Sequence, residues 1–156
     1  MISTDVGALF ESGCSLIVGT VDREGRPEAT RGWGAVVQDD EVRLRLFVER
    51  AAALTLENLV DPGVIAVTAT DVPTFESVQV KGRVLEIVPT TEADHSCSVR
   101  HFEAFTAAIH SSDGTPFELL ERIRPGDLVA LVVEILEVFD QTPGPGAGRS
   151  LARAES

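Results

Sequence analysis

The order of strand-like and helix-like segments is the feature of this sequence that most restricts its fold. Three segments rich in aliphatic and β-branched residues, 14–21, 28–38 and 42–48, follow one another with only short turns between them. A helical segment, two more strand-like segments, two helices and a last apolar segment complete the chain. Because strands and helices do not alternate, this order disfavours a parallel sheet and predicts an antiparallel barrel with helices at its side.

The individual segments follow from hydrophobic periodicity and from turn residues. Apolar positions at helical spacing predict helices at 4–12, 50–59, about 90–109 and 115–121, and β-rich runs predict further strands at 64–70, 75–88 and 128–139. Gly82 lies inside one of these strands, where a glycine is typical of a bulge or a barrel corner.

Length and composition indicate a single domain. The 156 residues are 44% hydrophobic and 24% charged, which is ordinary for a globular protein with one core. We predict a barrel domain over 1–141 and a Pro/Gly-rich C-terminal tail over 142–156. No apolar run is long enough to span a bilayer and no signal peptide is evident, so we expect a cytoplasmic protein whose two cysteines are free thiols.

The net charge of −12 limits the partners that this chain can bind. A strongly acidic surface repels phosphate backbones and anionic lipids, which argues against nucleic acid and against membranes as the main ligands. A small anionic ligand remains compatible with the sequence where its few cations converge.

Three local strings carry a resemblance to a known family. They are 18–27, which has a Val-Gly-Thr-Val-Asp start and a Gly-Arg-Pro end, 47–62, and Ser-Val-Gln-Val-Lys-Gly at 77–82. With the order of the elements, they make the chain resemble the pyridoxamine 5′-phosphate oxidase-like FMN-binding split-barrel family over about residues 13–146. The ending at 140–146 is similar to that of a bacterial subgroup of this family.

This resemblance implies both a fold and a site. The implied fold is α+β, an antiparallel Greek-key split β-barrel of about six strands with flanking helices. The implied assembly is a homodimer that holds a small-molecule ligand, flavin mononucleotide (FMN), at the dimer interface. Carried over by position, the resemblance implies that the cofactor is bound by Arg31, Trp33, Phe47, Val48, Arg50, Thr55, Gln79 and Lys81.

The helix start departs from the family pattern. Members that bind flavin tightly have Ser and Lys in the first turn of this helix, whereas Ala53 and Thr55 stand here and Glu49 adds a negative charge nearby. Loss of a lysine–phosphate contact removes a charge-assisted hydrogen bond worth about 1.5–3 kcal/mol. Flavin binding is therefore expected to be weak, or a deazaflavin, heme or no cofactor takes its place.

Several of these residues also have ordinary structural interpretations. Arg31 can lie over the barrel rim, Trp33 can be a core or interface residue, and Gln79 and Lys81 can face solvent or a dimer interface. Arg43 and Arg45 alternate on one strand and are expected at a solvated edge or a dimer contact.

A second group of side chains, His95, Cys97 and His101, lies in the predicted helix near residue 100. Cys97 and His101 are four residues apart and share a helix face, which would allow heme or a transition metal to bind. Since no third ligand accompanies them, we predict no metal site.

The sequence supports two functions. The first is a flavin-dependent oxidoreductase of unassigned substrate, whose catalytic residues cannot be named. The second is a non-catalytic dimeric binding module that has lost tight flavin binding. Pyridoxamine-phosphate oxidation itself is not expected, because residues 141–148 lack the second basic cluster that a substrate phosphate needs.

Overall fold

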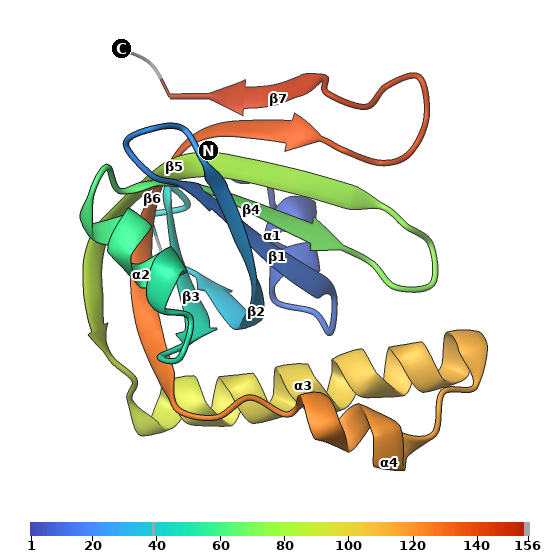
Figure 1. The fold of residues 1–156 in the computed structure, drawn as a ribbon. Coiled ribbons are helices and arrows are strands. Elements are labelled where there is room, and N and C mark those ends of the chain that lie inside the picture. Colours follow the sequence, from blue (N-terminus) through green and yellow to red (C-terminus); the bar gives the residue numbers. More distant parts are fainter. Residues whose placement is uncertain (39, 155–156) are drawn as a thin grey trace.

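The computed structural model describes residues 1–38 and 40–154 (Figure 1). Residues 39, 155 and 156, which fall in the predicted turn at 38–41 and in the predicted tail, lie outside the described residues. No helix in the described ranges combines the length and the apolar character needed to cross a membrane.

The described residues form seven strands, four α-helices and one 3₁₀ turn. The strands are β1 (Ser15–Val21), β2 (Pro27–Val37), β3 (Arg43–Glu49), β4 (Val64–Thr70), β5 (Ser77–Pro89), β6 (Leu128–Asp140) and β7 (Ser150–Arg153). The helical elements are α1 (Thr4–Phe10), α2 (Ala53–Val60), α3 (Glu92–Asp113), α4 (Phe117–Leu120) and the 3₁₀ turn η1 (Glu121–Ile123).

Six of the strands close into an antiparallel barrel. The strand order is β3-β2-β1-β4-β5-β6, and β3 pairs with β6 to complete the ring (Figure 1). The predicted antiparallel barrel with flanking helices is therefore confirmed. The predicted irregularity at Gly82 is confirmed as well, because the register between β5 and β6 shifts between Lys81 and Gly82.

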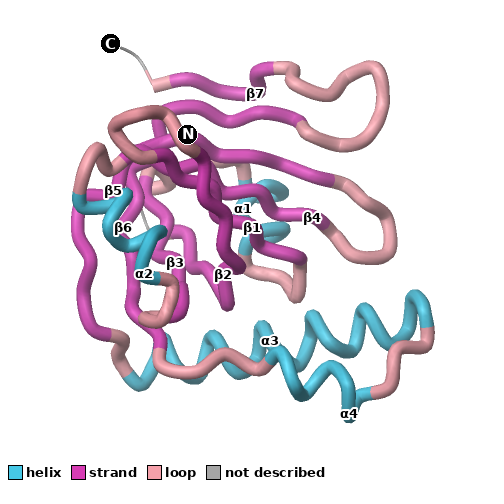
Figure 2. The backbone as a smooth tube through the Cα atoms, viewed as in Figure 1, coloured by secondary structure: helices cyan, strands magenta, loops and turns pink. Residues whose placement is uncertain are grey.

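The seventh strand lies inside the segment that the sequence predicted as a tail. After β6 the chain turns back, with the Gly148 N–H donating to the Asp140 carbonyl at 2.7 Å. β7 then pairs antiparallel with the second half of β6, whose first half pairs with β3. Figure 2 shows β7 at one end of the barrel and α3 with α4 at the other.

The core fills the barrel because apolar residues alternate along each strand. In β1, Leu16 and Val18 are fully buried whereas Ile17 between them is 40% exposed, and β4 buries Val67 and Ala69 in the same way. The side chains that alternate with these buried ones, such as Ile17, therefore point to the outside of the barrel.

Helix α3 packs against β2. Its N-terminus is closed by a capping box between Thr91 and Asp94, and Gly114 in the left-handed region (φ 75°) ends it. Asp94 also accepts two hydrogen bonds from Arg45 of β3, at 2.8 and 2.6 Å. Arg45 is thus paired within the chain, which corrects the expectation of a solvated edge or dimer contact.

Helix α2 begins three residues later than predicted. The Ala52 N–H bonds to the Glu49 carbonyl and the Arg50 N–H to the Asp127 carbonyl, so these residues form a turn. Ala52 at the N-cap offers no side-chain acceptor to the first turn of the helix.

Candidate functional site

The outside of the β2-β1-β4-β5-β6 sheet carries a large hollow. The strand registers place two rows of side chains across this surface, which we call the outer face. The first row is Arg31, Ile17, Thr68, Gln79 and Phe139. The second row is Ala29, Gly19, Ala66, Lys81 and Glu137.

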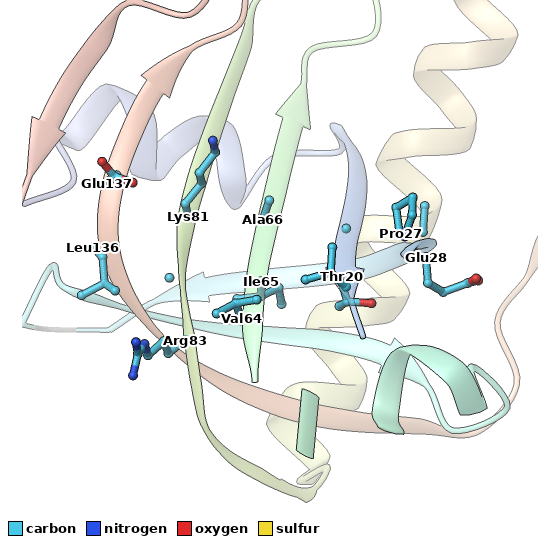
Figure 3. Close-up of a pocket in the computed structure, with 14 residues that line it drawn as sticks. Thr20, Pro27, Glu28, Val64, Ile65, Ala66, Lys81, Arg83, Leu136 and Glu137 are labelled. Carbon is cyan, nitrogen blue, oxygen red and sulfur yellow. The ribbon is translucent and has the colours of Figure 1, made fainter. Parts of the chain in front are cut away.

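A cavity of about 750 Å³ opens over the second row and the positions beside it (Figure 3). Its lining is mostly apolar and small, and its charged side chains are Glu28, Lys81, Arg83 and Glu137. In Figure 3, Ala66 lies on β4 beside Lys81 and Arg83 on β5. A volume of this size suits a drug-sized or cofactor-sized ligand, and apolar walls with a few polar groups are typical of such sites.

The β5 candidates both lie on the outer face. Lys81 is exposed, lines the cavity and holds its Nζ 4.8 Å from the centre of the Phe139 ring. The Gln79 side-chain amide donates to Thr68 Oγ1 at 2.9 Å. The structure thus places Gln79 and Lys81 two positions apart on one surface, available to a ligand or to a second chain.

Arg31 occupies the far edge of the same face. Its guanidinium is half-buried, donates to Ser15 Oγ at 3.2 Å and lies 5.0 Å from the centre of the Phe105 ring of α3. Within the described part of the chain, no carboxylate forms an ion pair with it. Burial lowers the pKa of Arg31 from its ordinary value. A cation that is partly desolvated and lacks an acidic partner is poised to bind an anion.

Trp33 follows Arg31 on β2 and packs against α3. It is 3% exposed, its ring lies 6.0 Å from that of Phe102, and Arg31 is 5.8 Å from its centre. Its Nε1–H is buried without a hydrogen-bond partner in the described residues. Because buried polar groups are nearly always satisfied, this donor needs an acceptor from outside the described chain, such as water or a ligand.

The other predicted cofactor residues do not join this group. Phe47, Val48 and Thr55 are 0%, 0% and 1% exposed, so their side chains belong to the interior of the chain. Phe47 packs beside Gly34. Arg50 is exposed in the turn before α2.

Arg31 and Lys81 lie on the same face but are separated by three inter-strand steps, or about 14 Å. In one chain, the predicted cofactor residues on this face therefore form two separate groups, Arg31 with Trp33 and Gln79 with Lys81. The sequence analysis named Arg31 and Lys81 as candidates but not the small residues between them, Gly19 and Ala66, since their alignment depends on strand register.

A second, smaller cavity of about 470 Å³ lies between α3, β2 and the corner that joins α1 to β1. Cys97 and His101 both line it, which confirms that they share a helix face, whereas His95 does not. No cluster of three or more His, Cys, Asp or Glu side chains among the described residues is arranged to hold a metal ion.

No protein-family model matches the chain, and no curated protein matches it. Solved structures do resemble it. HupZ of Group A Streptococcus aligns with a TM-score of 0.58 at 20% identity over 95% of this chain and 100% of that one. An F420 reductase aligns with a TM-score of 0.54 at 18% identity over 88% and 98% of the two chains.

A third similar structure is from Clostridium acetobutylicum. This protein, related to general stress protein 26 and described within the pyridoxinephosphate oxidase family, aligns with a TM-score of 0.53 at 18% identity, over 86% of this chain and 84% of that one. At these identities the likeness concerns architecture alone. The chain therefore has the antiparallel split-barrel fold of the pyridoxamine 5′-phosphate oxidase-like proteins.

Proposed function

We propose that two copies of this chain pack through their outer faces and hold a flavin-type cofactor, FMN or a deazaflavin, between them as an oxidoreductase. The observation that carries this proposal is the pairing of two donors at the edge of a hollowed apolar face: Arg31, which has no acidic partner among the described residues, and the unsatisfied Nε1–H of Trp33. Both groups only donate hydrogen bonds, so an anionic tail is the complementary ligand.

The residues present fit such a cofactor in its main parts. A planar aromatic ring needs an apolar wall, which Ile17, Gly19 and Ala66 provide on the outer face. The anionic tail would bind Arg31 and the indole N–H of Trp33. When bound, the cofactor itself would supply the hydride or electron transfer, and this chain's residues would position it and exclude water.

The open, apolar character of the outer face supports a homodimer. On one chain alone, a flavin ring that lies on the strands between Arg31 and Lys81 would leave its second face in solvent. A two-fold axis through the outer face would bring Gln79 and Lys81 of the second copy toward Arg31 of the first. The exposed apolar side chain of Ile17 and the cavity beside it would then be covered.

The residues at the start of α2 favour a modest affinity for FMN. Ala52 at the N-cap and Ala53 after it contribute no hydroxyl or ammonium group to a phosphate, and Glu49 is held nearby by the Gly126 N–H at 3.2 Å. We therefore expect dissociation constants for FMN in the micromolar range. Since one similar structure is an F420 reductase, a deazaflavin is the natural competitor.

The cytoplasm is the proposed setting. Cys14 and Cys97 are both free thiols, and free thiols persist in a reducing compartment.

The test is a titration of purified protein with FMN and separately with F420, followed by visible absorbance and by calorimetry. We expect saturable binding to a dimer, with Arg31→Ala weakening the affinity about tenfold or more. Arg122→Ala, which removes an exposed arginine of the 3₁₀ turn η1, is the matched control and should leave affinity unchanged. Absence of binding at tens of micromolar of either compound would contradict the proposal.

The second candidate is a binding module without turnover. It is favoured by the alanine-rich start of α2, which offers a phosphate no hydroxyl or ammonium group. Under this hypothesis the cofactor, or heme in its place, binds but is not reduced by nicotinamide donors. Stopped-flow reduction of the loaded protein separates the two functions.

A further inference from the structure

The smaller cavity, between α3, β2 and the α1–β1 corner, has a composition that suits a ligand of its own. Its lining combines one carboxylate, one guanidinium, one imidazole and one thiol with small apolar side chains. These residues are Glu11, Ser12, Gly13, Ala35, Val36, Cys97, Arg100, His101 and Ala104. None of them lines the cavity of the outer face, so a ligand here would not compete for that surface.

The two charges of this cavity are opposite yet do not neutralise each other. Among the described residues, neither Glu11 nor Arg100 forms an ion pair. Glu11 is held in place because its Oε1 accepts the Val37 N–H at 2.7 Å, which leaves the second oxygen available. A fixed carboxylate and an unpaired guanidinium in one cavity match a ligand that carries both an ammonium and a carboxylate group.

His101 adds a second acceptor to the cavity. The side chain is only 6% exposed, and its Nδ1 lies 3.0 Å from the Ser12 carbonyl oxygen. A carbonyl can only accept, so Nδ1 carries the proton in this contact and Nε2 of the neutral ring keeps its lone pair. Nε2 has no hydrogen-bond partner among the described residues. Burial lowers the pKa of His101, which keeps the ring neutral near pH 7.

The frame of the cavity is tightly packed. A Cβ on Gly13 would come within 2.5 Å of Ala104 Cβ, so the α1–β1 corner lies in direct contact with α3. His101 Nδ1 joins the same two elements through Ser12. Because two of its walls touch each other, the cavity is a preformed feature of the fold.

We propose that this cavity binds a small zwitterion of the α-amino acid class. Arg100 would bind the carboxylate, while Glu11 and His101 Nε2 would accept hydrogen bonds from the ammonium group. Ala35, Val36, Ala104 and the Cys97 thiol would contact the ligand's side chain. An amine alone or a carboxylate alone would satisfy only one of the two charges.

The first test is calorimetry of the cofactor-free protein with the common L-α-amino acids, with ethylamine and propionate as the two half-ligands of alanine. We expect at least one amino acid to bind saturably, and Arg100→Gln and Glu11→Gln each to weaken that affinity about tenfold or more. Arg122→Gln and Glu118→Gln, on exposed sites elsewhere, are matched controls and should bind as the unmodified chain does.

Cys97 provides an independent readout. Cys14 is fully buried with its pKa raised to about 11 by burial, so alkylation of the folded protein by iodoacetamide reports on Cys97. We expect the amino acid that binds to slow this alkylation several-fold, and Arg100→Gln to abolish the protection. Absence of both heat and protection would overturn the proposal, as would equal protection by ethylamine or propionate. Flavin is absent from both assays, so their outcome is independent of the proposed cofactor.

Discussion

At the scale of the residue, Gly82 shows how closely two strands can approach. A Cβ at this position would lie 1.8 Å from the Glu134 carbonyl oxygen on β6, so only glycine fits without displacing backbone. The sequence identified the irregularity from the glycine alone. The reason for it, contact with a carbonyl about fifty residues later, depends on a long-range pairing that no local pattern contains.

Gly82→Ala should therefore destabilise the protein by about 3 kcal/mol or more, because the backbone of β5 or β6 must shift. Chemical denaturation followed by circular dichroism measures this loss. Gly126→Ala is the matched control, since the nearest atom to its added Cβ is a Glu49 carboxylate oxygen at 3.8 Å. Equal stabilities of the two variants would show that the barrel tolerates the added methyl group.

His101 predicts a pH dependence of stability. Burial, and secondarily the charge of Arg31, lowers its folded pKa below the ordinary value of 6.5, although the Ser12 carbonyl acts in the opposite direction. An unfolded chain then binds more protons than the folded one, so this contribution is complete above about pH 6.5 and declines as the pH falls.

The measurement is the free energy of unfolding between pH 7.5 and about 5.5 for the unmodified chain and for His101→Asn. The asparagine amide can still donate to the Ser12 carbonyl but does not titrate. We expect the difference between the two chains to narrow as the pH falls. A constant difference would show that His101 has the same pKa in both states.

At the scale of the element, the order of strands and helices could be predicted well because periodicity and turn residues are local properties. The errors have long-range causes. Helix α2 starts late because Arg50 is bonded to the distant Asp127 carbonyl. β7 went unpredicted because a short segment after a Gly/Pro-rich loop becomes a strand only when β6 offers it an unpaired edge.

For the candidate site too, the local features could be predicted from the sequence and the long-range ones could not. The strand positions of Arg31 and Lys81 followed from the sequence, but their separation across β1 and β4 required the register. The unsatisfied donor of Trp33 could not be predicted, because burial under α3 creates it.

One ion pair among the described residues joins α3 to β3. Arg45 holds the pKa of Asp94 below its ordinary value through two charge-assisted hydrogen bonds, and the Thr91 backbone and side chain support it. Asp94→Asn should cost about 2 kcal/mol, since it removes the charge that strengthens the hydrogen bonds from Arg45. A folded pKa below the unfolded value means that this contribution is present above about pH 4 and declines as the pH falls further.

Denaturation of Asp94→Asn at pH 7 and at about pH 3 checks both statements. We expect Asp94→Asn to lower the free energy of unfolding strongly at pH 7 and less at about pH 3. Asp5→Asn, at an exposed position on α1, is the control and should change stability little at either pH. An equal loss at both pH values would contradict the assigned role of the ion pair.

At the scale of the whole molecule, the outer face is the surface on which the proposed dimer depends. Ala66 lies near its centre, beside Lys81 and across from Gly19. Ala66→Glu should yield a monomer, because a charge would be buried without a partner at the interface. Light scattering coupled to size exclusion measures the mass, and flavin titration measures the linked loss of cofactor.

Leu119→Glu on α4 alters a side chain that is 48% exposed and lies away from this face, so it serves as the matched control. We expect it to leave the mass unchanged. If the dimer persists in Ala66→Glu but dissociates in Leu119→Glu, the interface lies at the helical end of the molecule and not on the outer face.

Closure of the barrel by β3 and β6 has a consequence for the order of folding. Arg43 pairs with Glu134, about ninety residues further along the chain, so the entropy of a long loop is lost before this ladder forms. During synthesis β3 and β5 must remain unpaired on one edge until β6 has emerged. We expect those exposed edges to make the unfinished chain prone to aggregation, and the closure of the ring by β6 to be a slow, non-local step of folding.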